Sequence, residues 1–348
     1  MSLYLDNGYV NAREWFEDPA TFIFAIGGRG TGKTFGALEY LTNPENSAGK
    51  FVYMRRSQSQ IDACKLAELN PFKAVNNAYG RSCVLCPIGK YICGVYHGEV
   101  DKNGALVASG APVGLGIALS VFSNIRGVDG LDYDYILFDE FIKEKHERPI
   151  QAEGEAFLNA YETLNRNREM QGRPPIKCIL LSNSNDLASP ILEAFGLVDF
   201  VDKMQRHGRN KGRSGNGTIS VYLYGDSPIS KAKAETALYK ATKSAEFRNM
   251  SLQNQFSARN YEYVKTMPIQ EYRPFVSVGD VTVYRHVNNG TYYVVDGVKA
   301  EERYTTLPIE VKGFRRAFYF VYEAMLDKRV FFASASVKIR FERVWQSG

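Results

Sequence analysis

Short apolar runs separated by polar and glycine-rich segments recur along the first part of the chain. Because strands buried on both faces of a parallel sheet are continuously apolar, each run is predicted to be a β-strand. Helix-favouring stretches follow the first run and occupy residues 151–170. This alternation predicts an α/β domain with a central, mostly parallel sheet. The predicted strands are Phe22–Ile26, Lys50–Arg56, Tyr135–Phe138 and Lys177–Leu181.

Two segments depart from this alternation. Residues 1–21 read as a lead-in helix or turn that ends at Pro19. Residues 80–116 alternate short apolar stretches with Gly and Pro, a pattern typical of an inserted β-meander.

The composition of the chain changes after residue 203. Residues 204–217 are rich in Gly, Arg and Lys, which predicts a linker or mobile basic loop, and residues 229–247 form an Ala- and Lys-rich predicted helix. Residues 259–348 are dense in Tyr, Phe and Val with period-two stretches, typical of a small β-rich α/β domain. We therefore expect three parts: residues 1–203, a basic linker or lid at 204–258, and a small domain at 259–348.

The first predicted strand leads into a phosphate-binding loop. The pattern G-x-x-x-x-G-K-[ST] is matched with a strand before it and helix-forming residues after it. Backbone N–H groups and the helix dipole can there neutralise polyphosphate charge. Lys33 is expected to reach the β and γ phosphates of ATP, and the Thr34 hydroxyl to hold Mg²⁺. The predicted ATP-binding residues are Gly27, Gly28, Arg29, Gly30, Thr31, Gly32, Lys33 and Thr34.

The third apolar run ends in two carboxylates, Asp139 and Glu140. Asp139 suits a place near Mg²⁺, and Glu140 is placed to orient and deprotonate the water that attacks the γ phosphate. Ser182 and Asn183 end the next run, where a polar side chain can hydrogen-bond the water or the γ phosphate and act as a sensor. An Asn that only supports a turn is the plainer alternative.

Several arginines stand at predicted element ends. Arg55 and Arg56 end the second strand, where they either face nucleotide or a neighbouring subunit or are simply solvated. Arg166 and Arg168 lie at a predicted helix end. Either could reach the nucleotide of an adjacent subunit as an arginine finger, or be solvated, and spacing does not separate the two.

The composition of the chain is that of a globular protein. The chain has 348 residues, enough for two domains or a little more, and 45% hydrophobic and 23% charged residues, as in globular proteins. No apolar run approaches the ~20 residues of a membrane span, and the N-terminus lacks the pattern of a signal peptide, so we expect an intracellular protein with no membrane partner.

The five cysteines suggest reduced thiols. Cys83, Cys86, Cys93 and His97 could form a zinc site, but the same stretch also reads as a β-hairpin turning at Pro87–Lys90.

Charge is unevenly distributed around a net +5. Residues 203–248 hold ten Lys or Arg against three acidic residues, and residues 259–348 hold fourteen against ten, so the front of the chain is acidic. This polarity predicts a polyanionic partner for the rear part, nucleic acid first. The tentative DNA-binding residues are Arg206, Arg209, Lys211 and Arg213.

The combined motifs resemble the DNA-packaging ATPases of small podoviruses. The stretches that carry the resemblance are GGRGTGKT at 27–34, ILFDEFI around Asp139 and Glu140, ETLNRNRE at 162–169, LLSN at 180–183 and MSLQNQF at 250–256. An Arg inside the phosphate loop is also common in the wider group of large terminases of tailed phages. The resemblance covers most of the chain and is strongest between residues 22 and 184.

The resemblance implies a homomeric ring ATPase of ASCE type, with a pentamer as the expected size. Such a ring sits at the portal vertex of a prohead, with the portal and in some cases a packaging RNA as partners, and pumps double-stranded DNA inward. It would act in the host cytoplasm and be absent from the mature virion. By the same resemblance Lys33, Thr34, Asp139 and Glu140 carry the ATPase site, Arg166 matches the finger acting in trans, and Asn183 lies in the coupling motif.

The resemblance also implies a C-terminal domain with a vestigial, RNase H-like nuclease fold that keeps a nucleic-acid-binding role. Asp280 and Asp296 are its best strand acids, without an obvious third carboxylate for a two-metal cluster. One position departs from relatives, which can carry Lys where this chain has Gln58, so a trans role there is in doubt.

Three other functions are compatible with parts of the sequence: a terminase-type enzyme with a live nuclease, a small-molecule P-loop kinase, and a nucleotide-binding structural protein of the virion. The basic rear half argues against the kinase. Glu140 argues against a protein that only binds nucleotide.

Overall fold

The computed structural model describes residues 2–46, 49–102, 106–125, 132–144, 147–183, 186–225, 227, 229, 232, 234–241 and 263–346. The chain divides into two compact units. The first comprises residues 1–195 and 204–255, and the second residues 196–203 and 256–348. The segment expected as a separate linker, 204–258, thus groups up to residue 255 with the first unit. The MSLQNQF stretch lies outside the described residues.

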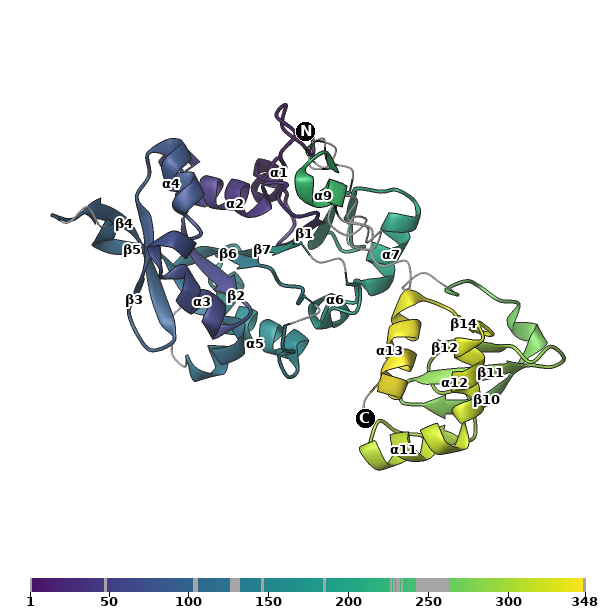
Figure 1. Cartoon of the computed structure of the whole chain (residues 1–348). Coiled ribbons are helices and arrows are strands. Elements are labelled where there is room, and N and C mark those ends of the chain that lie inside the picture. The colour runs from purple at the N-terminus through teal and green to yellow at the C-terminus, as the bar shows by residue number, and fades with distance from the viewer. Residues whose placement is uncertain are drawn as a thin grey trace. The chain divides into compact units, whose positions relative to one another are not determined.

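The first unit is built on a nine-stranded sheet of order β3-β4-β5-β2-β6-β7-β1-β9-β8 (Figure 1). The strands from β5 to β9 in this order are parallel, as the apolar runs predicted. Strand β7 lies between β1 and β6, which matches the ASCE-type expectation. The strands are β1 Phe22–Gly27, β2 Lys50–Arg55, β3 Cys83–Pro87, β4 Ile92–Val100, β5 Leu106–Ala118, β6 Tyr133–Asp139, β7 Lys177–Ser182, β8 Lys211–Arg213 and β9 Ile219–Tyr224.

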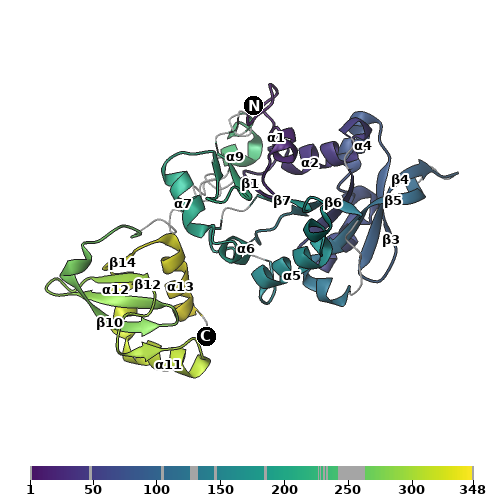
Figure 2. The same ribbon diagram turned by 180° about the vertical axis from the view of Figure 1, so that it is seen from behind.

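Helices cover both faces of this sheet, with α1 and α2 on one side and α5 and α6 on the other (Figures 1 and 2). Alternate residues of each strand supply the two cores: Ile23 and Ala25 belong to the cluster around Trp15, whereas the Phe24 ring packs against Phe141 and Phe195. The helices of this unit are α1 Arg13–Glu17, α2 Lys33–Thr42, α3 Gln58–Cys64, α4 Lys73–Tyr79, α5 Glu153–Asn165, α6 Pro190–Ala194 and α9 Ala237–Ala241, with α7 Val198–Arg206 crossing the division between the units.

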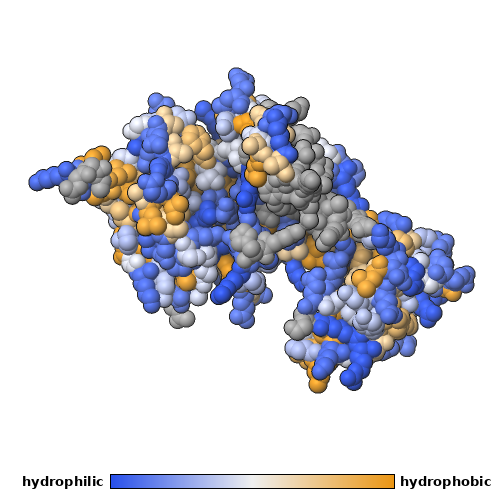
Figure 3. Space-filling model, viewed as in Figure 1, coloured by the Kyte–Doolittle hydropathy of each residue, from blue (hydrophilic) through white to orange (hydrophobic). Residues whose placement is uncertain are grey.

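The predicted meander is present as β3, β4 and β5, which pair antiparallel at one edge of the sheet. Strands β4 and β5 continue beyond β3, because residues 97–100 pair with residues 106–109. Val100 and Val107 on this arm are 71% and 41% exposed, and hydrophobic residues gather near its end in Figure 3.

The second unit is an α/β domain around a five-stranded sheet of order β13-β10-β11-β12-β14. Strands β10 to β12 form an antiparallel meander, and β13 and β14 pair parallel at its two edges. Phe314, Val321 and Phe341 from three helices fill the core against this sheet. The elements are β10 Tyr272–Val278, β11 Val281–His286, β12 Tyr292–Asp296, β13 Arg303–Tyr304, β14 Val330–Phe332, α11 Pro308–Ala317, α12 Tyr319–Leu326 and α13 Ala335–Gln346.

Candidate nucleotide site

The phosphate loop turns between β1 and α2 on glycines that no larger residue could replace. Gly32 has φ +86°, and a Cβ built there would lie 2.8 Å from the Tyr9 ring. A Cβ at Gly27 would lie 2.6 Å from the Tyr224 side chain. The Val10 N–H donates to the Thr31 carbonyl at 3.0 Å, so the N-terminal segment lies directly against the loop. The eight predicted ATP-binding residues therefore form one continuous turn that the N-terminal segment contacts. This turn leads into the start of a helix, where anions bind.

The structure brings the phosphate loop and the end of β6 together. Lys33 is 4% exposed, and its Nζ donates to the carbonyls of Gly27 and Gly28 at 2.9 and 2.8 Å. The Thr34 hydroxyl donates to Asp139 Oδ1 at 2.9 Å. The two oxygen groups predicted to hold Mg²⁺ are thus neighbours although they are 105 residues apart in the chain.

Glu140 follows Asp139 at the carboxyl edge of the sheet with φ +58°, a conformation that costs energy in a residue with a side chain. Asn183 Nδ2 donates to Glu140 Oε1 at 3.4 Å, and Ser182 is buried beside Ile26 of β1. Burial raises the pKa of Glu140 above its ordinary value, and the nearby Arg55 opposes that rise. The predicted base and the predicted sensor are therefore in direct contact.

Arg55 joins the two acids, a contact that the sequence did not predict. Its Nη1 donates to Asp139 Oδ2 at 2.8 Å and its Nη2 to Glu140 Oε2 at 2.5 Å. Burial opposes the charge on Arg55, but Tyr53 and the two carboxylates raise its pKa above the ordinary value. The only signal in the sequence was the position of Arg55 at a strand end, where parallel strands place their ligand-facing residues.

Arg56 is also buried rather than solvated. Its guanidinium pairs with Glu153 at 2.6 Å and with Glu147 at 2.7 Å. Glu153 lies in the first turn of α5, so this pair fixes the start of that helix to the end of β2. In the phosphate loop, Arg29 forms an ion pair with Glu144.

The two arginines at the end of α5 have different surroundings. Arg168 is 1% exposed and donates to Asp134 Oδ1 at 2.7 Å, to the Tyr133 carbonyl at 2.6 Å and to the Pro174 carbonyl at 3.0 Å. Arg166 is exposed, caps the helix with φ +44°, and donates from Nε to the Thr163 carbonyl at 3.3 Å. Of the two, Arg166 is the one whose side chain reaches the surface.

The basic segment predicted to be mobile is partly built into the sheet. Lys211 and Arg213 belong to β8, and both pair with Asp18, at 3.5 and 3.0 Å. Lys211 also contacts Glu14 at 3.2 Å. Arg206 ends α7, and Arg206 and Arg209 are exposed. Two of the four tentative DNA-binding residues thus have acidic partners within the first unit.

The cysteine-rich stretch folds as the hairpin β3–β4, with Cys83 opposite His97 and Pro87 opposite Cys93. Burial raises the pKa of the Cys83 thiol to about 11. Among the residues that the structure describes, no group of three or more His, Cys, Asp or Glu is arranged to hold a metal ion. The described part of the chain also contains no helix long and apolar enough to cross a membrane.

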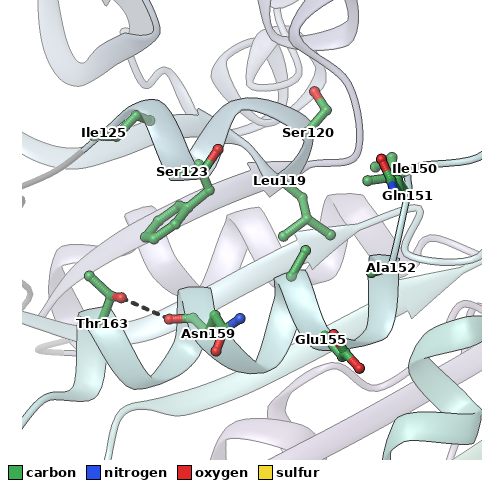
Figure 4. Close-up of a pocket in the computed structure, with 12 residues that line it drawn as sticks. Leu119, Ser120, Ser123, Ile125, Ile150, Gln151, Ala152, Glu155, Asn159 and Thr163 are labelled. Atoms are coloured by element: carbon green, nitrogen blue, oxygen red, sulfur yellow. Dashed lines mark hydrogen bonds between the residues drawn. The ribbon is translucent and has the colours of Figure 1, made fainter.

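A groove of about 400 Å³ lies between the short helix η3, Leu119–Asn124, and α5 (Figure 4). Leu119 and Ile125 form its apolar side, and Glu155, Asn159 and Thr163 of α5 its polar side. None of its lining residues belongs to the phosphate loop or to the acids that end β6. The groove is therefore separate from the nucleotide site in its composition.

Comparison with known proteins identifies the family. Residues 96–307 match the model of the podovirus DNA encapsidation protein (Gp16) family. The chain belongs to this family. The DNA packaging proteins of Bacillus phages PZA and phi29 are each 26% identical to it over 276 residues, which cover 78% of this chain and 74% of theirs. The chain is thus a DNA-packaging protein, as the motifs predicted.

Two solved structures share the fold of this DNA encapsidation protein over almost its whole length. A chain of the bacteriophage Phi-29 viral genome packaging motor assembly superposes with a TM-score of 0.67 at 20% identity and covers 99% of both chains. The Phi-28 gp11 DNA packaging motor superposes with a TM-score of 0.61 at 17% identity, covering 97% of this chain and 96% of that one. The predicted combination of a P-loop α/β domain with a smaller second domain is confirmed.

Proposed function

We propose that this encapsidation protein hydrolyses ATP with Mg²⁺ and uses the energy to move double-stranded DNA into a preformed prohead. The observation that carries the proposal is the convergence of Thr34, Asp139, Glu140 and Asn183 at one edge of the sheet. These residues come from three different elements and have the types and positions that phosphoryl transfer to water requires.

Each residue of the site has a role in binding ATP and Mg²⁺ or in activating the attacking water. The backbone of the loop and Lys33 would bind the phosphates, and Thr34 and Asp139 offer the oxygen ligands that Mg²⁺ prefers. When bound, Mg²⁺ would neutralise phosphate charge. Glu140 would accept a proton from the attacking water, and Asn183 would hold the Glu140 carboxylate in position.

We further infer that the protein works as a ring, with Arg166 acting on the nucleotide of the adjacent subunit. Arg166 is exposed at the end of α5 and held in a conformation that costs energy, a feature that clusters at functional sites. Arg168 is buried, which supports a structural role for it instead. A pentamer at the prohead portal, in the host cytoplasm, remains the expected assembly, with the portal as partner and with or without a packaging RNA.

The proposal is tested by ATP turnover of purified protein with and without duplex DNA. Glu140→Gln and Arg166→Ala should each abolish DNA-stimulated turnover, and mixing the two variants should restore part of it, because each supplies what the other lacks. A finger acting in trans is worth about 10³-fold or more in rate. Arg13→Ala, which removes an exposed arginine of α1, is the matched control and should behave as the parent does.

Other results of the turnover experiment would favour a different function. No effect of DNA and full activity in Arg166→Ala would favour a small-molecule kinase or a structural nucleotide-binding protein. For a kinase, the groove beside α5 is the available acceptor site, but its lining shares no residue with the phosphate loop.

A further inference from the structure

Two arginines of the second unit face each other directly across neighbouring strands. Arg273 of β10 is paired in register with Arg285 of β11, and both are exposed. Directly opposed side chains in an antiparallel pair have Cβ atoms only about 5 Å apart, and like charges there destabilise the sheet. Among the described residues, neither guanidinium forms an ion pair with a carboxylate. A bound anion would remove the repulsion.

The pair lines a shallow cleft of about 270 Å³. The lining residues are Arg273, Pro274, Phe275, Arg285, His286 and Val287. Glu271 lies 3.3 Å from His286 Nε2, and it forms no ion pair with Arg273 or Arg285. The cleft is thus a positively charged depression on two paired strands.

The Arg273 guanidinium is hydrogen-bonded to the backbone beside it, and the Arg285 guanidinium lies near an aromatic ring. Arg273 Nη1 donates to the carbonyls of Gln270 and Tyr272 at 3.0 and 3.2 Å, which leaves the edge formed by Nε and Nη2 without a hydrogen bond to the described residues. Arg285 lies over the Phe275 ring, with its Cζ 5.9 Å from the ring centroid. The planar fork of a guanidinium group matches the paired oxygens of a phosphate group.

We propose that this cleft binds the phosphodiester backbone of duplex DNA, so that the second unit contacts the DNA through Arg273 and Arg285. The ligand class rests on the proposed function, because a packaging protein acts on duplex DNA. The contact adds to the exposed arginines of the basic segment, and its ligand is recognised by charge and fork geometry and not by base sequence.

The test compares the full-length double variant Arg273→Gln/Arg285→Gln with Lys312→Gln/Arg316→Gln. The control removes the same charge from exposed positions of α11 that do not line the cleft. Binding of a labelled mixed-sequence DNA duplex of about 30 base pairs is measured between about 50 and 200 mM salt, and a matching RNA duplex is measured in parallel.

Loss of two phosphate contacts should make the negative slope of log K against log salt shallower by about 2 in the cleft variant, with a much smaller change in the control. An unchanged slope, an equal change in the control, or a loss confined to the RNA duplex would each overturn the proposal. ATP turnover without DNA should equal that of the parent in both variants, which shows that the first unit is intact.

The two proposals fail separately. If the parent hydrolyses no ATP but binds duplex DNA through the cleft, the motor function is wrong and the cleft stands. If DNA-stimulated turnover is present but the cleft variant binds DNA as the parent does, only the cleft proposal is wrong.

Discussion

Arg55 is the side chain on which the positions of both site carboxylates depend. It holds Asp139 with one nitrogen and Glu140 with another, while Asp139 also receives hydrogen bonds from Thr34 and from the Tyr53 hydroxyl at 3.2 Å. The side chain of Arg55 is 16% exposed, so its charge is only weakly screened. Its role is positioning: a fork with two separate donors fixes two acids that one point charge could not.

Two replacements of Arg55 test separately whether the site needs the positive charge of this side chain or the arrangement of its two donors. Arg55→Gln leaves two acids without their cation, and removal of one partner from a buried ion pair typically costs about 3 kcal/mol or more in the free energy of unfolding. Arg55→Lys keeps the positive charge but loses the two separate donors of the guanidinium group. It should therefore recover most of the free energy of unfolding that Arg55→Gln loses, but it should not recover the ATP turnover. Urea unfolding, nucleotide binding and turnover of both variants check this.

Full turnover in Arg55→Lys would contradict the positioning role, because charge alone would then suffice. Equal stability of the parent and Arg55→Gln would show that the two acids do not need the cation to remain buried.

Among the elements, the N-terminal segment and β8–β9 are joined through one buried carboxylate. Asp18 accepts hydrogen bonds from the Ala20 N–H, the Ser220 and Tyr222 hydroxyls and Arg213. Burial of Asp18 opposes ionisation, but these donors hold its pKa at about 2. The basic segment around β8 is thereby fastened to the start of the chain.

Because the pKa of Asp18 is lowered on folding from the usual 3.8, the ionised form stabilises the folded protein above about pH 4. Asp18→Asn should lower the free energy of unfolding by about 2 kcal/mol near neutral pH. The difference from the parent should shrink as the pH falls from 4 toward 2. Denaturant titrations of both proteins across this range measure it.

Ser220→Ala is the milder comparison, since it removes one donor and leaves the charge of Asp18 paired. A difference between the parent and Asp18→Asn that does not change with pH would show that the carboxylate charge contributes nothing.

For the molecule as a whole, the second unit carries acids that resemble part of a nuclease site but are already neutralised. Arg340 of α13 forms ion pairs with both Asp280 and Asp296, the latter at 2.7 Å. In the described part of the chain no third carboxylate joins them in a metal-binding group. The pairing with Arg340 argues against these two acids acting as metal ligands.

We therefore expect no cleavage of supercoiled plasmid DNA by the purified protein with Mg²⁺ or Mn²⁺, and no gain of cleavage in Arg340→Ala, since two acids alone do not form a two-metal site. Gel analysis of plasmid after incubation checks both. Cutting by the parent that disappears in Asp280→Ala would instead establish a live nuclease.

The sequence predicted what local patterns can specify. Continuous apolar runs predicted the strands, and the fixed spacing of the phosphate-loop pattern predicted the turn from β1 into α2, at whose start Lys33 and Thr34 lie. The contacts it did not predict join residues far apart in the chain: Arg55 with Glu140, Arg56 with Glu153, and Arg213 with Asp18. From the sequence, basic residues in a glycine-rich segment are expected to be solvated, because an acidic partner from a distant element cannot be recognised.

Spacing also could not separate Arg166 from Arg168, because both follow the same helix. Only the burial of Arg168 against Asp134 distinguishes them.

The position of β1 in the sheet has a consequence for synthesis on the ribosome. Its neighbours β7 and β9 are made long after it, and Trp15 bonds the Tyr224 hydroxyl across 209 residues of chain. The nascent phosphate loop therefore lacks the strands that flank it until residue 224 has emerged. Contacts of such long range form slowly. A subunit should thus acquire nucleotide binding only after β9 is complete, so translation products that end before residue 224 should bind no nucleotide.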